Sequence, residues 1–364
     1  MAGTLVLHSE REFVVNTVLT RCAALCNQQK FHSFMIILPT SRWARDFREK
    51  LLKITSCGAL SAPYILGYNR AIEVLSTRLS DTQHQGISRH IQLLAGYAIL
   101  KRFVDSGSAA GTAISDIPIA PLVDSLLGLV SKIKNAGIDP RQLSHLLGKK
   151  KNIDRDYKIA LLVDFFQQYE LFKSQMGYAD QADRLKSVLA TLEKQDTRFP
   201  EVFPELEFLA VIGFDLITRK DAELFSALSG TVPEMIFSLD YDPERPWIFE
   251  HIGDIIESLS RHFTPVTQSH DMKKIYSDSP GKKISSLFFK SPDKITIARR
   301  IEEPFLNIIA AKDPDDEIDI ICRWIKLLLR DNPMQDPEKV CICFPRIEDY
   351  LPTVRNTFGR YGIP

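Results

Sequence analysis

The first 75 residues alternate short, wholly apolar runs with longer segments whose apolar side chains recur every three or four positions. Each run has the length and composition of a buried strand, and the segments between them have the spacing of amphipathic helices. The runs cover residues 4–7, 34–38 and 63–67. Because strands that alternate with helices are typical of a parallel, helix-covered sheet, we expect an α/β fold.

Strand-like runs are missing from residues 80–205, where the apolar spacing is helical instead. The clearest helical patterns lie at residues 90–104, 120–135, 158–175 and 183–194. Gly137 and Pro140 end one of these helices, because glycine suits a left-handed cap and proline cannot continue a helix. The simplest interpretation is a large all-helical insertion within the α/β domain.

Strand patterns return at residues 208–212 and 234–239, with a helix between them. Residues 264–304 are polar and weakly patterned, which indicates a connection between domains. A second α/β unit then begins, with predicted buried strands at residues 305–310 and 340–344 and an amphipathic helix after each. No further strand completes this second sheet, so we expect the chain to be a fragment of a longer protein.

The composition is that of an ordinary globular protein, with 364 residues of which 45% are hydrophobic and 25% are charged. Lys and Arg together number 46, as do Asp and Glu, so there is no global electrostatic footprint for nucleic acid. An apolar run of membrane-spanning length and a signal-peptide pattern are both absent, which predicts a cytoplasmic protein with no membrane partner. The six cysteines lack the spacing of a zinc site and are expected to be buried free thiols.

The connection after the first predicted strand, His8-Ser9-Glu10-Arg11, lies where many nucleotide-binding domains hold a phosphate. A phosphate loop needs glycines that let backbone N–H groups converge, a lysine for the outer phosphates and a hydroxyl for magnesium. This connection contains no glycine and places a carboxylate at the phosphate position. We therefore expect a degenerate nucleotide site and no ATP hydrolysis by this chain.

Acidic residues follow the two later strands, where a nucleotide-hydrolysing site would hold magnesium. Asp215 has no acidic neighbour, so it is either the remaining acid of the degenerate nucleotide site or a loop residue that caps the next turn. Asp240 and Asp242 have a spacing that fits either a metal site or a plain turn. The turn is the simpler interpretation, because the sequence indicates no third ligand.

Polar residues also follow the second and third predicted strands, at the edge where open parallel sheets bind ligands. The candidate DNA contacts are Thr40, Ser41, Arg42, Tyr68, Asn69 and Arg70. The first three begin a helix, so backbone N–H groups, a hydroxyl and a guanidinium can hold a nucleic-acid phosphate there. The alternative for these three is a helix cap with a solvated arginine. The other three can stack on a base or hydrogen-bond to it.

Four stretches occur in an order that covers nearly the whole chain. They are IILPTSRWARDFREKLL with PYILGYNRAIEVL, then KIKNAGIDPRQL, then GYADQADRLKSVL with LAVIGFDLITRKDAELFSAL and MIFSLDYD, and finally DPDDEIDIICRWIKLLLRD with DPEKVCICFPRIEDYLPTVRNTFGRYGIP. In this order the chain resembles the N-terminal, helicase-like region of the AddB/RexB-type subunit of helicase–nucleases, a relative of superfamily 1 helicases. The last stretch is the most specific, because its acidic helix start, short strand and Y-G-I-P ending recur in the second helicase-like domain of that family.

The resemblance implies a domain plan and a set of partners. The implied parts are a first RecA-like domain at residues 1–80 and 205–265, a helical insertion at 80–205, a linker at 266–300 and the incomplete start of a second RecA-like domain at 300–364. Full-length members carry a C-terminal PD-(D/E)XK nuclease domain, to which an iron–sulfur cluster and magnesium belong, so no cofactor is expected in this chain. The implied partners are DNA, as a single strand or a duplex end, and an AddA-like helicase subunit. By analogy, residues 40–42 and 68–69 match two helicase motifs that touch single-stranded DNA.

These features together predict a helicase-like, ATPase-inactive DNA-binding scaffold from a subunit of a DNA-repair and recombination nuclease. The chain itself is not expected to be catalytic, whereas the full-length protein is expected to be a DNA exonuclease. Two other hypotheses stay open. One is a protein-interaction scaffold that docks a helicase partner, and the other is a small-molecule enzyme whose crevice is lined by Gly67, Gly213 and Asp215.

Overall fold

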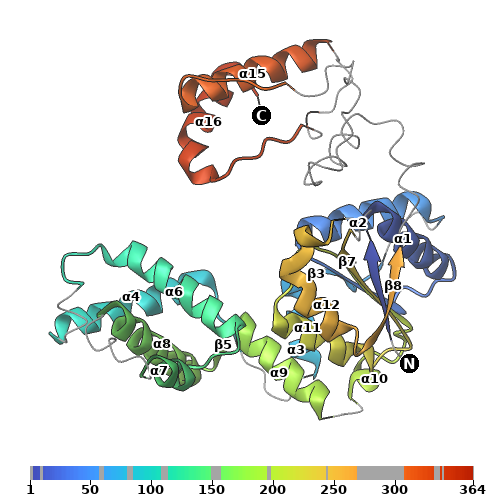
Figure 1. Ribbon diagram of the computed structural model, residues 1–364, viewed down its shortest axis with the longest axis horizontal. Helices are drawn as coiled ribbons and strands as arrows, with labels where there is room; N and C mark the ends of the chain where they lie inside the picture. The colour runs from blue at the N-terminus through green and yellow to red at the C-terminus, as the bar shows by residue number, and fades with distance from the viewer. Residues whose placement is uncertain are drawn as a thin grey trace. The chain divides into compact units, whose positions relative to one another are not determined.

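The chain folds into two units, Met1–Ile275 and Tyr276–Pro364. The computed structural model describes residues 3–8, 11–56, 61–79, 85–107, 114–148, 157–194, 198–242, 245–268, 307–331, 337 and 340–363. The first unit holds a sheet domain and a lobe of helices, and the described residues of the second unit include two helices (Figure 1). All the candidate site residues of the sequence lie in the first unit.

A six-stranded sheet forms the centre of the first unit, and all its strands are parallel. The strands lie in the order β3-β2-β6-β7-β1-β8. In chain order they are β1 Gly3–His8, β2 Phe34–Leu38, β3 Ile65–Gly67, β6 Phe208–Phe214, β7 Glu234–Asp240 and β8 Phe263–Gln268. Strands β2 and β6 are buried along their whole length, as continuous apolar sequences require in a sheet covered on both faces. The predicted α/β fold with a parallel sheet is confirmed.

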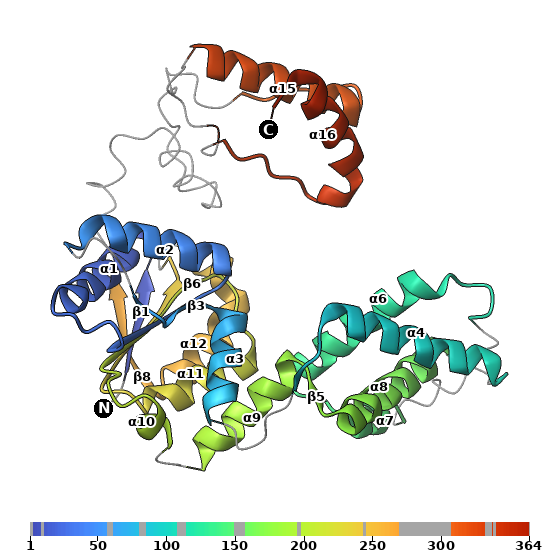
Figure 2. The same ribbon diagram turned by 180° about the vertical axis from the view of Figure 1, so that it is seen from behind.

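Helices cover both faces of this sheet (Figures 1 and 2). On one face, α1 Arg11–Asn27 and α2 Ser41–Ile54 bury side chains such as Cys22 and Phe47 against the sheet. The helices of the other face are α3 Tyr68–Leu79, α9 Gln181–Glu193, α10 Arg198–Val202, α11 Arg219–Ser229 and α12 Gly253–Leu259. Two hydrophobic cores result, one on each side of the sheet, because successive side chains of a strand point to opposite faces.

Between β3 and β6 the chain leaves the sheet and forms the helical lobe that the sequence predicts (Figure 2). Its helices are α4 Arg89–Asp105, α6 Ile119–Asn135, α7 Pro140–Gly148 and α8 Tyr157–Met176. The lobe has its own core, in which Leu100, Phe165 and Phe166 are fully buried. A two-residue parallel pair, β4 Gln85–Gly86 with β5 Tyr178–Ala179, joins the two ends of the lobe, so the insertion is not wholly helical.

Helix α9 follows the lobe in sequence but packs with the sheet domain. Its buried residues Leu185, Val188 and Leu189 belong to the same core as the sheet, and the helix contacts α3 and α11. The lobe therefore ends near β5 in space, whereas the sequence places the end of the insertion at about residue 205. An amphipathic pattern predicts a helix but does not reveal which core its apolar face enters.

The sheet also extends further along the chain than the sequence indicates. We expect a weakly patterned connection from residue 264 and a linker from residue 266, whereas Phe263–Gln268 forms β8 and pairs with β1 along its whole length. Because β8 is an edge strand with mostly polar or exposed side chains, it lacks the apolar run that marks a buried strand. The 3-10 helix η2, Pro246–Ile252, and α12 connect β7 to β8.

The second unit contains α15, Pro314–Asp331, and α16, Ile347–Tyr361, which contact each other. The predicted buried strand at residues 340–344 is wrong, because these residues have no strand structure and are half-buried or exposed. The described part of the other predicted strand, residues 307–310, is not a strand either. A strand needs a partner for its backbone groups, and the described residues of this unit contain none. The start of a second RecA-like domain here stays a prediction.

The structure bears on two expectations drawn from composition, one about the cysteines and one about membrane-spanning helices. Cys22, Cys26 and Cys322 are buried free thiols, as predicted, and burial raises the pKa of Cys22. Cys341 and Cys343 are exposed, so the prediction of buried thiols is wrong for this pair, while Cys57 lies outside the described residues. In the described parts of the chain, no helix combines the length and the apolar character needed to cross a membrane.

Candidate functional site at the carboxyl edge of the sheet

The parallel sheet brings the candidate residues to one edge. Strands β1, β2, β3, β6 and β7 all end there, and the segments that follow them carry every candidate that the sequence singles out. Strands β1 and β7 are neighbours, but the helices that follow them cover opposite faces of the sheet. Helix α1 follows β1 on one face, and α12 follows β7 on the other. Open α/β sheets bind ligands in the crevice at such points.

Arg11 is the centre of this edge. Its guanidinium contacts the carboxylates of Asp215, after β6, and Asp240, at the end of β7. A second hydrogen bond runs from Arg11 Nε to Asp240 Oδ1 at 3.3 Å, and the guanidinium lies 5.1 Å from the ring centroid of Trp43. Partial burial disfavours the charged guanidinium, but hydrogen bonds and the charges of both carboxylates prevail and raise the pKa of Arg11. The positively charged side chain of Arg11 therefore lies where the sequence predicts a degenerate nucleotide site.

His8 lies beneath this bridge, at the end of β1, with an exposure of 2%. Its Nδ1 is 3.5 Å from Asp240 Oδ1, yet neither ring nitrogen has a hydrogen-bond partner among the described residues. Burial lowers the pKa of His8, the charge of Asp240 acts in the opposite direction, and Arg11 lowers it further. The surroundings of the imidazole therefore favour its neutral form. Ser9 and Glu10, the other two residues of the proposed degenerate nucleotide site, lie outside the described residues.

The acidic residues after β7 are held by arginines. Asp240 binds Arg11, whereas the buried Asp242 accepts a hydrogen bond of 2.6 Å from Nε of Arg245. The backbone N–H of Tyr241 donates to the carbonyl of His8, which extends the pairing of β7 with β1. Asp242 thus has a structural role in the turn, the simpler of the two interpretations, whereas Asp240 connects the end of β7 to Arg11.

The candidates after β2 form the start of α2. Thr40 is the N-cap and its Oγ1 accepts a hydrogen bond of 3.3 Å from the N–H of Trp43. Ser41 and Arg42 are exposed, and within the described residues the Arg42 guanidinium has no charged partner. The helix-cap interpretation is confirmed for Thr40. The contact of these residues with a nucleic-acid phosphate stays a prediction, which the exposure of Ser41 and Arg42 permits.

Two glycines let the edge close up tightly. A Cβ on Gly67, at the end of β3, would lie 2.6 Å from the backbone nitrogen of Ser41. Gly213 has φ +84°, in the left-handed region, and a Cβ there would lie 2.8 Å from the Trp43 ring. Both glycines are therefore required for the close packing of α2 against the strand ends. This packing accounts for them without a small-molecule crevice.

The candidates after β3 are engaged within the protein. Tyr68 is half-buried, donates its hydroxyl to Asp221, and packs edge-on against Phe214 and Phe225. Asn69 accepts a 2.6 Å hydrogen bond from Gln181 on α9. Arg70 is exposed and pairs with Glu73 at 2.7 Å. Tyr68 and Asn69 therefore join the start of α3 to α11 and α9, whereas Arg70 pairs within α3.

A groove runs between α1 and α2 beside the Arg11 bridge. Its volume is about 470 Å³. The lining combines cations and an aromatic ring with apolar and acidic side chains: Arg11, Glu12, Val15, Asn16, Leu38, Arg42, Trp43, Asp46, Phe47 and Lys50. Cations beside a partly exposed aromatic side chain are the residue types that hold a nucleic-acid backbone and a base.

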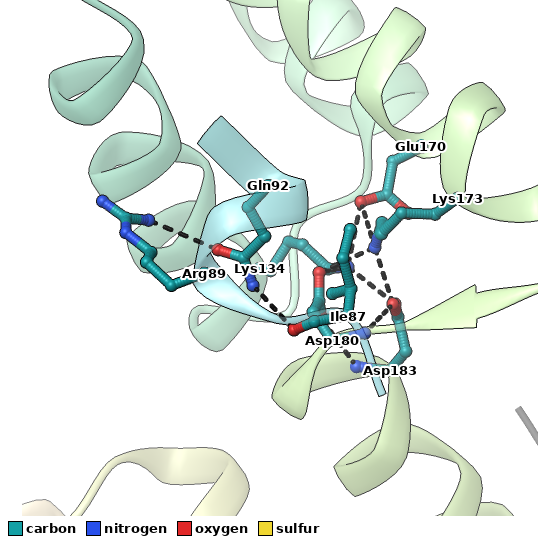
Figure 3. Close-up of polar contacts among 8 residues, drawn as sticks. All are labelled: Ile87, Arg89, Gln92, Lys134, Glu170, Lys173, Asp180 and Asp183. Atoms are coloured by element: carbon teal, nitrogen blue, oxygen red, sulfur yellow. Dashed lines mark hydrogen bonds and ion pairs between the residues drawn. The ribbon is translucent and has the colours of Figure 1, made fainter. Parts of the chain in front are cut away.

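A second polar cluster escapes the sequence analysis. Figure 3 shows Lys134 of α6 and Lys173 of α8 facing Glu170, Asp180 and Asp183. Each lysine nitrogen lies 2.6 to 2.9 Å from an oxygen of all three carboxylates. The Asp180–Asp183 capping box at the start of α9 is the part of this cluster that the sequence indicates. The helical spacing does not predict that the two lysines are the partners of these carboxylates.

The three carboxylates of this cluster have the grouping of a metal site, with ligand oxygens within 4.8 Å of one another. The two lysines already fill the space and balance most of the charge. Burial disfavours the ionised Asp180, but the lysines prevail and hold the pKa of that carboxyl well below its usual range. The chemistry of the cluster is therefore that of an internal ion-pair network that ties the lobe to α9.

The fold and this edge define a class: an α/β domain with a parallel six-stranded sheet and a helical lobe, with an arginine bound between two carboxylates at the carboxyl edge of the sheet. No family model matches the chain. The chain is similar to the B-type subunit of the ATP-dependent helicase/deoxyribonuclease from Natranaerobius thermophilus, with 22% identity over 367 residues. That similarity covers 91% of this chain and 29% of the relative, so the chain spans less than a third of the length of the protein it matches.

Proposed function

We propose that the chain is a helicase-like, ATPase-inactive DNA-binding scaffold within a subunit of a DNA-repair and recombination nuclease. The similarity to a B-type helicase/deoxyribonuclease subunit supports the class, because it extends over 91% of this chain. The full-length protein is then a DNA exonuclease, and its magnesium and iron–sulfur cluster belong to a PD-(D/E)XK domain outside these residues.

The single observation that carries the ATPase-inactive role is the bridge from Arg11 to Asp215 and Asp240. In a nucleotide-hydrolysing sheet, acids at this edge hold a magnesium ion, and the loop after the first strand wraps the phosphates. Here one arginine binds both acids and offsets part of their charge, and the sequence of the loop contains no glycine. We therefore attribute the proposed loss of ATP chemistry to the charge of Arg11 as well as to the absence of glycine from the loop sequence.

DNA binding is assigned to the start of α2 and the adjoining groove. Arg42 and Arg45 are exposed, and neither has an acidic partner among the described residues. The N-terminus of a 14-residue helix adds a partial positive charge at the same place. Arg42 and Trp43 line the groove together, so a phosphate and a stacked base can be held side by side there.

The same proposal gives the chain an AddA-like helicase subunit as a protein partner and a cytoplasmic location. The name of the relative describes one subunit of an assembly, and this supports a partner subunit. A scaffold that guides DNA without hydrolysing ATP needs such a motor to move the strand.

The test is single-strand binding by the chain, followed by fluorescence anisotropy of a labelled oligothymidine at low salt. We expect binding that weakens roughly tenfold in Arg42→Ala, the effect of losing one charged hydrogen bond. ATP hydrolysis should stay at background with or without DNA. Arg261→Ala is the control, because Arg261 is also exposed but pairs with Glu257 and precedes β8, and so lies at the opposite edge of the sheet.

Two results would contradict the proposal. The absence of single-strand binding, or an equal loss in Arg42→Ala and Arg261→Ala, would remove the assigned DNA contact. ATP hydrolysis above background that disappears in Asp215→Asn would show a working nucleotide site and overturn the ATPase-inactive role.

A further inference from the structure

Arg11 connects parts of the chain that are far apart in sequence. Its partners Asp215 and Asp240 lie 204 and 229 positions away, at the ends of two neighbouring strands. Its planar guanidinium presents several N–H groups in a fixed fork, so one side chain can bind two carboxylates at once. Arg11 thus stands where a bound ligand would otherwise cross-link the strand ends.

The surroundings of Arg11 have the character of a cation site. Two carboxylates point at the same position, and Trp43 supplies an aromatic face 5.1 Å from the guanidinium carbon. Beneath them lies His8, with an exposure of 2% and two ring nitrogens that lack a hydrogen-bond partner among the described residues. Carboxylate oxygens and a neutral imidazole are ligand types that divalent metal ions accept.

We propose that this edge is a cation-binding site that the chain fills with its own Arg11, a built-in ligand that holds the ends of β1, β6 and β7 together. Removing the guanidinium leaves the two carboxylates facing each other without a counter-charge, which destabilises the edge by repulsion. An added cation, either a guanidinium ion or a divalent metal ion, then replaces Arg11. The inference deepens the ATPase-inactive part of the proposed function, on which it rests, and does not depend on DNA binding.

A second arginine of the same helix provides an internal control. Arg21 also belongs to α1 and pairs with an acid of β7, since its Nη2 lies 3.0 Å from Glu234 Oε2. That pair lies at the start of β7, at the opposite edge of the sheet, and both side chains are about half exposed. Exposed pairs of this kind contribute little to stability, and Arg21 bridges no second acid among the residues that the structure describes.

The experiment compares the thermal unfolding of the wild-type chain, Arg11→Ala and Arg21→Ala. Each is measured in buffer alone, in millimolar guanidinium chloride and in millimolar MnCl2, with NaCl of equal ionic strength as the salt control. We expect Arg11→Ala to lower the melting temperature by about 2–4 °C or more. Guanidinium and Mn²⁺ should restore much of that loss in Arg11→Ala and leave the other two proteins unchanged. Asp240→Asn added to Arg11→Ala should abolish the restoration.

Arg11→Lys keeps the experiment informative if Arg11→Ala does not fold. Lysine retains the charge but not the fork, so its melting temperature should fall between those of the wild type and the alanine variant, with a smaller response to guanidinium. An equal response of all variants to the added cations would overturn the inference, as would stabilisation of the wild type by Mn²⁺ with an ATP analogue. Single-strand binding is measured separately, so failure of the DNA assignment and failure of this inference give different results.

Discussion

At the scale of single residues, the edge is governed by how each charge is compensated. Burial lowers the pKa of His8, the charge of Asp240 raises it, and the nearby Arg11, which binds Asp240, lowers it further. A charged imidazole there would gain from Asp240 but lose its hydration and face Arg11. Protonation of His8 is therefore less favourable in the folded state than in the unfolded chain.

Acid should weaken the fold through His8. Its pKa is lowered in the folded protein below the ordinary value of 6.5, so the unfolded chain binds the proton more tightly. The contribution of His8 is thus complete above about pH 6.5 and is lost progressively as the pH falls toward the folded pKa. Each unit of difference corresponds to about 1.4 kcal/mol. Urea unfolding of the wild type and His8→Leu between about pH 7.5 and pH 5 measures it.

We expect the free energy of unfolding to fall less steeply in His8→Leu than in the wild type over that interval. His262→Leu is the comparison, because His262 is exposed and shows no such burial. If the wild type and His8→Leu lose the same free energy on acidification, His8 is not the group responsible.

At the scale of elements, the contact between the lobe and α9 depends on buried charge. Lys173 of α8 has an exposure of 2% and reaches Glu170, Asp180 and Asp183. Burial disfavours its ammonium, but the three carboxylates prevail and raise the pKa of Lys173. The whole set is compensated only while both lysines are present.

Lys173→Met should destabilise the protein by about 3–5 kcal/mol, because Lys134 alone then faces three partly buried carboxylates. Methionine fills a similar volume, so the loss reports charge rather than a cavity. Chemical denaturation measures it, with Lys186→Met on the exposed side of α9 as the control. The double variant Lys173→Met with Asp183→Asn should recover part of the loss. A Lys173→Met protein as stable as the control would mean that the network contributes nothing.

The same elements show what a sequence can reveal. Apolar runs predict β2 and β6 because a strand buried on both faces has no polar positions, and helical spacing predicts α2 and α8. The sequence does not predict strand β8, because an edge strand needs no apolar run. It wrongly predicts a strand at residues 340–344, because an apolar run forms no strand without a partner.

For the candidate site, too, the sequence predicts the position of the residues but not their contacts. The parallel order alone predicts that residues after β1, β2, β6 and β7 share one edge. It cannot predict which partner each charge chooses, since Arg11 and Asp240 are 229 positions apart. Tyr68 shows the limit most clearly, because its position at the edge is predicted while its hydroxyl is taken by Asp221.

At the scale of the whole molecule, charge balance constrains how DNA can be bound. Basic and acidic residues number 46 each, so no long-range field draws a nucleic acid to the surface. The proposed DNA binding then depends on a few phosphate contacts made by unpaired cations. Arg42 and Arg45 on α2 have no acidic partner among the described residues, whereas Lys50 is paired with Asp46 at 2.9 Å.

The salt dependence of single-strand binding therefore should be modest. For single strands the logarithm of the affinity falls with the logarithm of salt by about 0.7 for each phosphate contact. Two to four contacts predict a slope of roughly −1.5 to −3. Arg42→Ala and Arg45→Ala should each make the slope shallower by about 0.7, whereas Arg261→Ala should leave it unchanged. A slope near zero would mean that the bound strand is held without phosphate contacts, and a slope far steeper than predicted would require a basic surface other than the start of α2.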